Sequence, residues 1–135
     1  MNKERPRLSD LHDEFEVIYV DIDIKYDLFK QTRIFQNVKD NISILVHDYE
    51  IQVYIRRSSH NNVHLKVITL LHTRFTFTEM MVIRSLLHDD PYRVLLDLRR
   101  IYLQGSAEVN RIFSAKNGNK VSEWITWEEY CATDE

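Results

Sequence analysis

The sequence has few of the residues that mark several common functional classes. Among its 135 residues are two glycines, two prolines and one cysteine. P-loops and Rossmann phosphate-binding fingerprints need several closely spaced glycines, so neither is predicted. The single cysteine, Cys131, excludes an intramolecular disulfide and a thiolate zinc cluster. An intracellular, cytoplasmic protein is therefore expected. No serine stands in a nucleophile-elbow motif, so a hydrolase of that type is not predicted.

Long apolar runs are also missing. Hydrophobic residues make up 44% of the chain and charged residues 29%, but no run approaches the roughly 20 apolar residues of a membrane span. The charged residues 1–6 lack the apolar core of a secretory signal. These features predict one globular domain of ordinary size that has no membrane partner.

Charge is unevenly distributed along the chain. The formal net charge is −3, yet residues 122–135 hold five acidic residues and no lysine or arginine. We expect a polar N-terminal arm at 1–14, one domain at 15–121 and an acidic tail at 122–135. The tail contains Trp124 and Trp127, which either close the core or contact a protein partner. The nearly neutral body neither indicates nor excludes nucleic-acid binding.

Hydrophobic periodicity predicts most of the secondary structure. Alternating apolar residues predict strands over 16–24, 51–56 and 63–67, the last two forming a hairpin around a turn at 58–62. Apolar residues three and four apart predict a helix over 27–47 with Asp27 as its N-cap. Thr76 and Glu79 fit a capping box that begins a helix over 77–87.

Residues 93–99 fit two structures. As a strand they would direct Val94, Leu96 and Leu98 inward, and as a helix they would form a short apolar stripe. We favour a strand because it completes a β-α-β-β-α-β order, and we expect another short strand over 109–113. The predicted fold is α+β, an antiparallel sheet with helices on one face, of RRM-like or ferredoxin-like topology.

Several acidic residues fall on the predicted outward face of this sheet. Asp21 and Asp23 are two apart on one strand, so their Cα atoms lie about 7 Å apart on the same face. Asp97 would be a third carboxylate on that face. Neighbouring carboxylates repel, and Mg²⁺ or Mn²⁺ bound between them relieves the repulsion. Alternatively, Asp21 and Asp23 are solvated surface acids and Asp97 forms a salt bridge with Arg93, Arg99 or Arg100.

Basic residues share the same predicted face. His64 and Lys66 alternate outward on the hairpin and could hold a phosphate, unless His64 is an ordinary exposed histidine. The arginines that could contact a nucleic-acid backbone are Arg56, Arg93, Arg99 and Arg100.

In this order the motifs Asp21-Ile22-Asp23, Asn62-Val63-His64 and Leu96-Asp97 resemble those of the archaeo-eukaryotic primase superfamily. These primase-polymerases act in DNA replication, and related forms occur in viral and plasmid-type replicons. The resemblance covers residues from about 16 to 101 and implies a metal-dependent nucleotidyltransferase. It implies that Asp21, Asp23 and Asp97 are catalytic and hold Mg²⁺ or Mn²⁺. It also implies that His64, with Lys66 nearby, contacts the nucleotide phosphates, and that DNA rather than RNA is the partner.

Two departures from that family bear on activity. Asn62 stands where the family has a smaller residue, and the family enzymes carry a second α/β module before the first motif, where this chain has about 15 residues. The chain is thus either a pared-down member or one that kept the fold and lost polymerase activity.

Three other functions fit the sequence less closely or less specifically than the nucleotidyltransferase function. A rolling-circle nuclease needs a second histidine two residues from His64, where Lys66 stands, and a supported tyrosine nucleophile. A non-catalytic nucleic-acid-binding or replication-accessory protein would stack bases on the outward Tyr19 and Tyr54. An assembly protein or homo-oligomer would use the tryptophan-containing tail.

Overall fold

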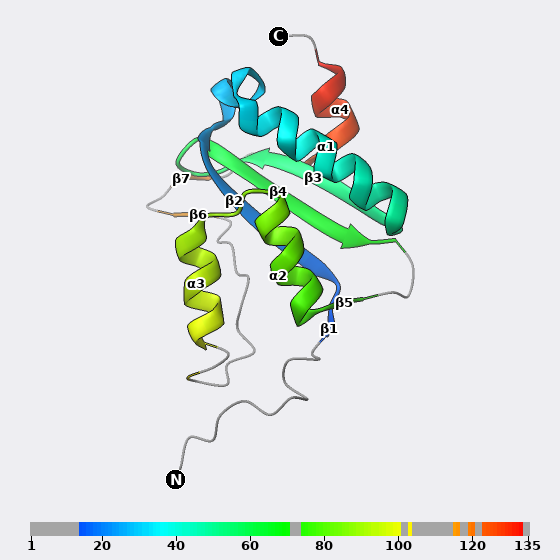
Figure 1. The fold of residues 1–135 in the computed structure, drawn as a ribbon. Helices are drawn as coiled ribbons and strands as arrows, with labels where there is room; N and C mark the ends of the chain where they lie inside the picture. Colours follow the sequence, from blue (N-terminus) through cyan, green and yellow to red (C-terminus); the bar gives the residue numbers. More distant parts are fainter. Residues whose placement is uncertain are drawn as a thin grey trace.

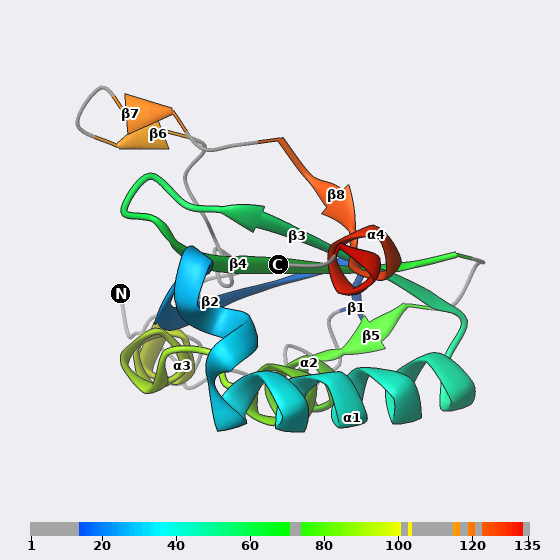
Figure 2. The ribbon, with the colours of Figure 1, turned by 90° about the horizontal axis from the view of Figure 1, so that it is seen from above.

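The computed structural model describes residues 14–70, 74–100, 103, 115–116, 119–120 and 123–133 (Figure 1). Its centre is a four-stranded antiparallel sheet with the strand order β2-β4-β3-β8. The strands are β2 (Val17–Lys25), β3 (Ile51–Arg57), β4 (Asn62–Thr69) and β8 (Ile125–Thr126). The helices α1 (Arg33–Asp48) and α2 (Phe77–Leu86) lie together on one side of this sheet (Figure 2). The α+β class and the antiparallel sheet with helices packed on it are confirmed, in agreement with a ferredoxin-like fold.

The core lies between the sheet and these helices. Residues 18, 20 and 22 of β2 are buried and alternate with less buried neighbours, as the predicted strand requires. The same alternation buries one side of β3 and β4, which pair as the predicted hairpin. Helix α1 buries Val38, Ile42 and Leu45, spaced four and three apart, against this layer.

The predicted helix over 27–47 is divided in two. A 3₁₀ helix, η2 (Tyr26–Gln31), precedes α1, and Thr32 between them has an extended backbone. The Thr32 hydroxyl accepts a hydrogen bond from the Phe35 amide at 3.2 Å and donates one to the Phe29 carbonyl at 2.7 Å. Thr32 is therefore the N-cap of α1, and the assignment of Asp27 as the cap was wrong. Asp27 instead pairs with Arg57 at 2.7 Å.

The predicted strand over 93–99 is wrong, because these residues form the helix α3 (Pro91–Arg99). Asp90 is its N-cap, accepting a hydrogen bond from the Tyr92 amide at 2.9 Å, and Pro91 occupies the first turn. Proline suits that position because its fixed φ is already helical and its missing N–H would have no helical partner there. Asp90 and Pro91 therefore mark the start of α3.

The fourth strand of the sheet comes instead from the C-terminal segment. Strand β8 pairs with β3 and leads into α4 (Trp127–Ala132), whose Trp127 and Tyr130 are buried against the Phe35 ring. Residues 123–133 therefore belong to the same core. Two short ribbons complete the described elements, β1 (Glu14–Phe15) with β5 (Phe75–Thr76) and β6 (Ala115–Lys116) with β7 (Asn119–Lys120). The expected strand over 109–113 and residues 1–13 of the predicted arm lie outside the described residues.

Side chains and a loop, rather than a strand, cover the outer edge of β2 at Asp21. The Asp21 amide donates to the Asp89 carboxylate at 2.9 Å, and the Asp90 amide donates to the Asp21 carbonyl at 2.8 Å. The corner between α2 and α3 thus pairs with the strand at the position where the predicted fourth strand would have lain. Such cover protects an edge from pairing with another chain.

Within the part of the chain that the structure describes, no helix is both long enough and apolar enough to span a membrane.

The capping box of α2 is confirmed and yields a first prediction. The Thr76 hydroxyl accepts from the Glu79 amide at 3.1 Å, and the Glu79 carboxylate accepts from the Thr76 amide at 2.9 Å. Thr76→Ala should lower the free energy of unfolding by about 1 kcal/mol, because it leaves a helix-end amide without its acceptor. Urea denaturation would measure the change. Thr78→Ala, an exposed threonine in the same first turn, should change it by less than half as much, and equal losses would contradict the cap.

Candidate functional site on the outer face of the sheet

The side of the sheet turned away from α1 and α2, here called the outer face, carries two rows of functional side chains. In the first row Asp21 lies opposite His64, and His64 lies opposite Arg56. In the second, Tyr19 lies opposite Lys66, and Lys66 lies opposite Tyr54. These residues alternate with the buried ones along each strand, so they project to the opposite side from the core. The predicted outward placement of all six is thus confirmed.

Trp124, just before β8, lies against both rows. Its indole is 4.2 Å from the Arg56 guanidinium carbon and 4.6 Å from the Lys66 ammonium nitrogen, measured to the ring centroid. The Tyr19 ring centroid is 6.4 Å from that of Trp124, and Lys66 also lies 5.0 Å from the Tyr54 ring. Each cation is close enough to an aromatic face for a cation–π interaction. We call these five residues the sheet-face cluster.

The cations of the sheet-face cluster are partly desolvated. Arg56 is 7% exposed, and burial lowers its pKa below the usual value. Burial also lowers the pKa of Lys66, and the neighbouring Arg56 charge lowers it further. Charges held against aromatic rings with little water around them interact more strongly with an anion than fully hydrated ones do.

His64 is neutral at pH 7. Burial lowers its pKa to about 4, and the Arg56 and Arg93 charges act in the same direction. Arg56 donates a hydrogen bond to Nδ1 of His64 at 3.3 Å, which leaves the ring proton on Nε2. The Asp21 carboxylate lies 3.6 Å from Nε2. His64 therefore orients Arg56 at neutral pH and does not act there as a cationic phosphate ligand.

The surroundings of Asp21 both raise and lower its pKa. Burial raises its pKa to about 6, and the charges of Asp89, Asp90 and Asp23 act in the same direction, while Arg93 opposes them. The carboxylate is therefore ionised at pH 7 but protonated in mildly acidic solution.

Asp97 does not lie on the outer face. It is buried in α3, where one carboxylate oxygen accepts from Arg84 at 2.7 Å and the other from Arg100 at 3.4 Å. The placement of Asp97 beside Asp21 and Asp23 was wrong, because that placement required residues 93–99 to be a strand. The salt bridge to Arg100, which the sequence left as an alternative, is present.

A buried ion network surrounds Arg84. The Arg84 side chain is fully buried, and its Nε donates to Asp89 at 2.6 Å. The other Asp89 oxygen accepts from Arg93 at 2.6 Å, as well as from the Asp21 amide. Sequence reasoning did not identify Arg84, although it continues the buried stripe of Met80 and Leu87 at helical spacing. A charged residue at such a position needs a buried partner, and that was the available signal.

The three carboxylates named by the resemblance do not form a metal site here. Among the described residues, no group of three or more His, Cys, Asp or Glu side chains is placed to hold a metal ion. Asp97 is occupied by two arginines, and Asp23 is exposed, with its carboxylate 3.5 Å from the Asn62 amide nitrogen. The residues therefore do not fit an ion shared by Asp21, Asp23 and Asp97, and Mg²⁺ or Mn²⁺ binding stays a prediction.

The predicted basic residues lie in two places, on the outer face of the sheet and on α3 with its C-cap. Arg56 and Lys66 belong to the sheet-face cluster. Arg93 and Arg100 are paired with the buried acids Asp89 and Asp97, and Arg99 is exposed on α3.

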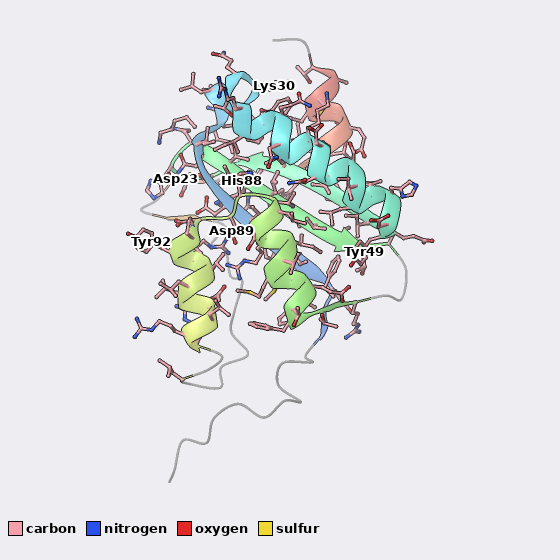
Figure 3. The ribbon with its side chains drawn as sticks, in the orientation of Figure 1. Asp23, Lys30, Tyr49, His88, Asp89 and Tyr92 are labelled. Atoms are coloured by element: carbon pink, nitrogen blue, oxygen red, sulfur yellow. The ribbon has the colours of Figure 1, made fainter. Side chains whose placement is uncertain are left out.

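An apolar cleft lies beside the outer edge of β2. It has a volume of about 500 Å³ and is bounded by Ile24, Ile34, Val94 and Leu98, with Asp23 among its polar lining residues. Figure 3 shows Asp23, His88, Asp89 and Tyr92 gathered where α2 ends and α3 begins.

Removing Arg84 should destabilise the fold strongly. Arg84→Met leaves two buried carboxylates, Asp89 and Asp97, without their shared partner. It should lower the free energy of unfolding by about 3–5 kcal/mol, as measured by urea denaturation. Arg100→Met removes a half-exposed partner of the same Asp97 and should cost less than about 1 kcal/mol. Similar small losses in both variants would show that the buried network is not a major source of stability.

The raised pKa of Asp21 predicts a pH-dependent effect of Asp21→Asn. The folded-state pKa of about 6 lies above the usual 3.8, so the ionised carboxylate costs stability above pH 6 and the cost vanishes below about pH 4. Asp21→Asn should therefore raise the melting temperature at pH 7.5, and the gain should shrink between pH 6 and pH 4.

His64 has the opposite effect on the pH dependence of stability, in the wild type and in Asp21→Asn alike. Because its pKa is lowered, the fold loses stability as the pH falls from 6.5 towards 4. Because Nε2 of His64 lies 3.6 Å from the Asp21 carboxylate, the two groups are coupled, and the comparison is therefore repeated in a His64→Gln background to remove that contribution. Asp23→Asn, on the exposed part of the same strand, is the matched control. A gain from Asp21→Asn that is the same at pH 4 and pH 7.5 would contradict the assignment.

Comparison with known proteins identifies no relative of the chain. No protein-family model matches it, and neither a curated protein nor a solved structure matches it. The resemblance to primase-polymerases therefore stays a prediction, and function is inferred from the geometry described above.

Proposed function

We propose that this protein binds single-stranded nucleic acid, DNA rather than RNA, on the outer face of its sheet. In this proposal the protein does not catalyse a reaction. One observation carries the proposal: Tyr19, Tyr54 and Trp124 are interleaved with Arg56 and Lys66 across neighbouring strands. Aromatic rings and cations combined on one face of a sheet are the features that single-strand-binding domains use.

The arrangement suits bases and phosphates together. Tyr19 and Tyr54 lie on either side of Lys66, two strand spacings or about 10 Å apart. Each ring offers a stacking surface worth about 1–3 kcal/mol per base, and the lysine between them can neutralise a phosphate. All three side chains, and Trp124, are partly exposed, so a ligand can reach them.

The acids limit where a nucleic acid can lie. Asp21 and Asp23 occupy the second half of β2 and would repel phosphates at neutral pH, whereas the cluster extends from Tyr19 towards β3 and β8. A bound strand is therefore expected to cross β4 and β3 near Lys66 and Tyr54 and to avoid the end of β2. Below pH 6 protonation of Asp21 reduces this repulsion.

The nucleotidyltransferase function has weaker geometric support. It requires carboxylates that share a metal, and Asp97 is bound by Arg84 and Arg100 instead. Incubating the protein with a single-stranded template, Mn²⁺ and nucleotides tests this function directly. Labelled product that disappears in Asp21→Ala would support it and would contradict the non-catalytic proposal.

Affinity for labelled oligonucleotides tests the binding proposal. Fluorescence anisotropy should detect binding to single-stranded DNA that weakens with salt, because phosphate contacts release counterions. Tyr54→Ala should weaken it at least about fivefold, since a stacking surface is lost. Lys66→Ala should weaken it and reduce the slope of log affinity against log salt by about 1.

Matched controls lie on other surfaces. Tyr49→Ala at the end of α1 and Lys39→Ala on α1 remove exposed residues of the same types and should leave affinity unchanged. Single-stranded RNA and duplex DNA of the same sequence complete the comparison. No binding, or equal losses in cluster and control variants, would refute the outer face as the binding surface.

A further inference from the structure

Helix α3 exposes several large apolar side chains and buries an acidic one. Its side chains Tyr92, Leu95 and Leu96 are 77%, 53% and 50% exposed, whereas Asp97 is 4% exposed. A surface helix normally turns its apolar stripe inward and its charges outward. Leu95 and Leu96 thus form an apolar surface that the described part of the chain leaves open.

The buried ion network fixes this orientation. Arg93 and Asp97 are four apart and so share one side of α3, where they contact Asp89 and Arg84. Tyr92, Leu95, Leu96 and Arg99 follow the spacing i, i+3, i+4 and i+7, which places them along one stripe of the helix. We call these four residues the α3 stripe.

The α3 stripe is symmetric in its own sequence. Its members are separated by three, one and three residues, so the spacing is the same in both directions. A second α3 running antiparallel, with a two-fold axis between Leu95 and Leu96, would set each of these leucines beside the same leucine of the second copy. The same operation sets Arg99 against Tyr92 of the second copy.

We propose that the α3 stripe is a homodimer interface, in which two copies of the chain pack α3 antiparallel about a two-fold axis. Such an interface is isologous: each contact occurs twice, and one patch is complementary to itself. A second copy is favoured over another protein because the patch supplies both halves of each contact, leucine to leucine and cation to ring.

Charges at the ends of the stripe support the same pairing. Arg99 is exposed, and neither it nor Asp90 has an ion pair within the described part of the chain. In the antiparallel pair the Arg99 guanidinium would lie on the Tyr92 ring of the second copy, beside Asp90 of that copy. A guanidinium over a tyrosine ring, next to a carboxylate, is favourable, whereas a parallel pair would bring like charges together.

The size of the patch sets the expected strength. A nine-residue helix is about 14 Å long, which is short for an interface of standard size, about 800 Å² per partner. The apolar cleft beside α3, which Leu95 also lines, adds to the available surface. The dimer should therefore be concentration-dependent, with a dissociation constant in the micromolar range. It shares no residue with the sheet-face cluster and does not depend on the proposed function.

Sedimentation equilibrium of the full chain from about 5 to about 500 µM tests the proposal. A monomer–dimer equilibrium is expected. Leu96→Glu places a carboxylate in the centre of the interface, and Arg99→Glu replaces a favourable charge beside Asp90 with a repulsive one. Each should weaken association at least tenfold. Ile44→Glu replaces an equally exposed apolar residue on α1, 59% exposed, and should not change it.

Oxidative cross-linking gives a second readout at the symmetry axis. In a Cys131→Ser background, Leu95→Cys should form a disulfide-linked dimer, and Ile44→Cys should not. Circular dichroism shows whether each variant is folded, and variants that fail to fold are replaced by Leu96→Gln and Arg99→Gln. A monomer at every concentration would overturn the proposal. So would a dimer that is insensitive to the α3 substitutions or equally sensitive to Ile44→Glu.

Discussion

The buried guanidinium of Arg84 is the interaction on which the other features depend. A fully buried charge must be compensated, and removing its partners is costly. Arg84 on α2 is compensated by Asp89 in the following corner and by Asp97 on α3. These two ion pairs join α2, the corner and α3 into one unit. Asp89, held in this way, also accepts the Asp21 amide, so the same network reaches the edge of the sheet. One Arg84 nitrogen, Nη2, is buried without a hydrogen-bond partner among the described residues.

The arrangement of the sheet follows from this unit. Because a carboxylate and the Asp90 amide occupy the β2 edge at Asp21, a fourth strand cannot pair there. The fourth strand of the described sheet is added at the other edge, where β8 pairs with β3. That addition brings Trp124 against Arg56 and Lys66 and completes the sheet-face cluster. The network therefore decides at which edge the sheet grows and, through that choice, which aromatic ring lies on its outer face.

Periodicity predicted those parts of the fold in which local pattern and tertiary burial agree. Strands β2, β3 and β4 alternate in sequence, so the hairpin of β3 and β4 and the common outer face of Asp21 and His64 followed from the sequence. The prediction for residues 93–99 was wrong because a short apolar run fits either a strand or a helix. The contact that decides between them joins Asp97 to Arg84 on another helix, and hydrophobic periodicity does not reveal such contacts. Strand β8 has two residues, too few to produce a recognisable alternation. Hydrophobic periodicity does not show which buried charges pair between helices and strands, and this information was missing from the prediction.

The same chemistry explains why Asp97 does not join Asp21 and Asp23. Carboxylates brought close together need a cation, and a divalent metal is one solution. For Asp89 and Asp97 this chain uses another: the guanidinium groups of Arg84, Arg93 and Arg100 neutralise both within the described residues. Arginine is a fixed part of the chain and stays charged at any physiological pH, so these two acids are committed to holding α3 in place. Asp21, next to this network but without an arginine at ion-pair distance in its described contacts, has a pKa that burial raises to about 6. Its charge therefore changes in mildly acidic solution, close to neutral pH.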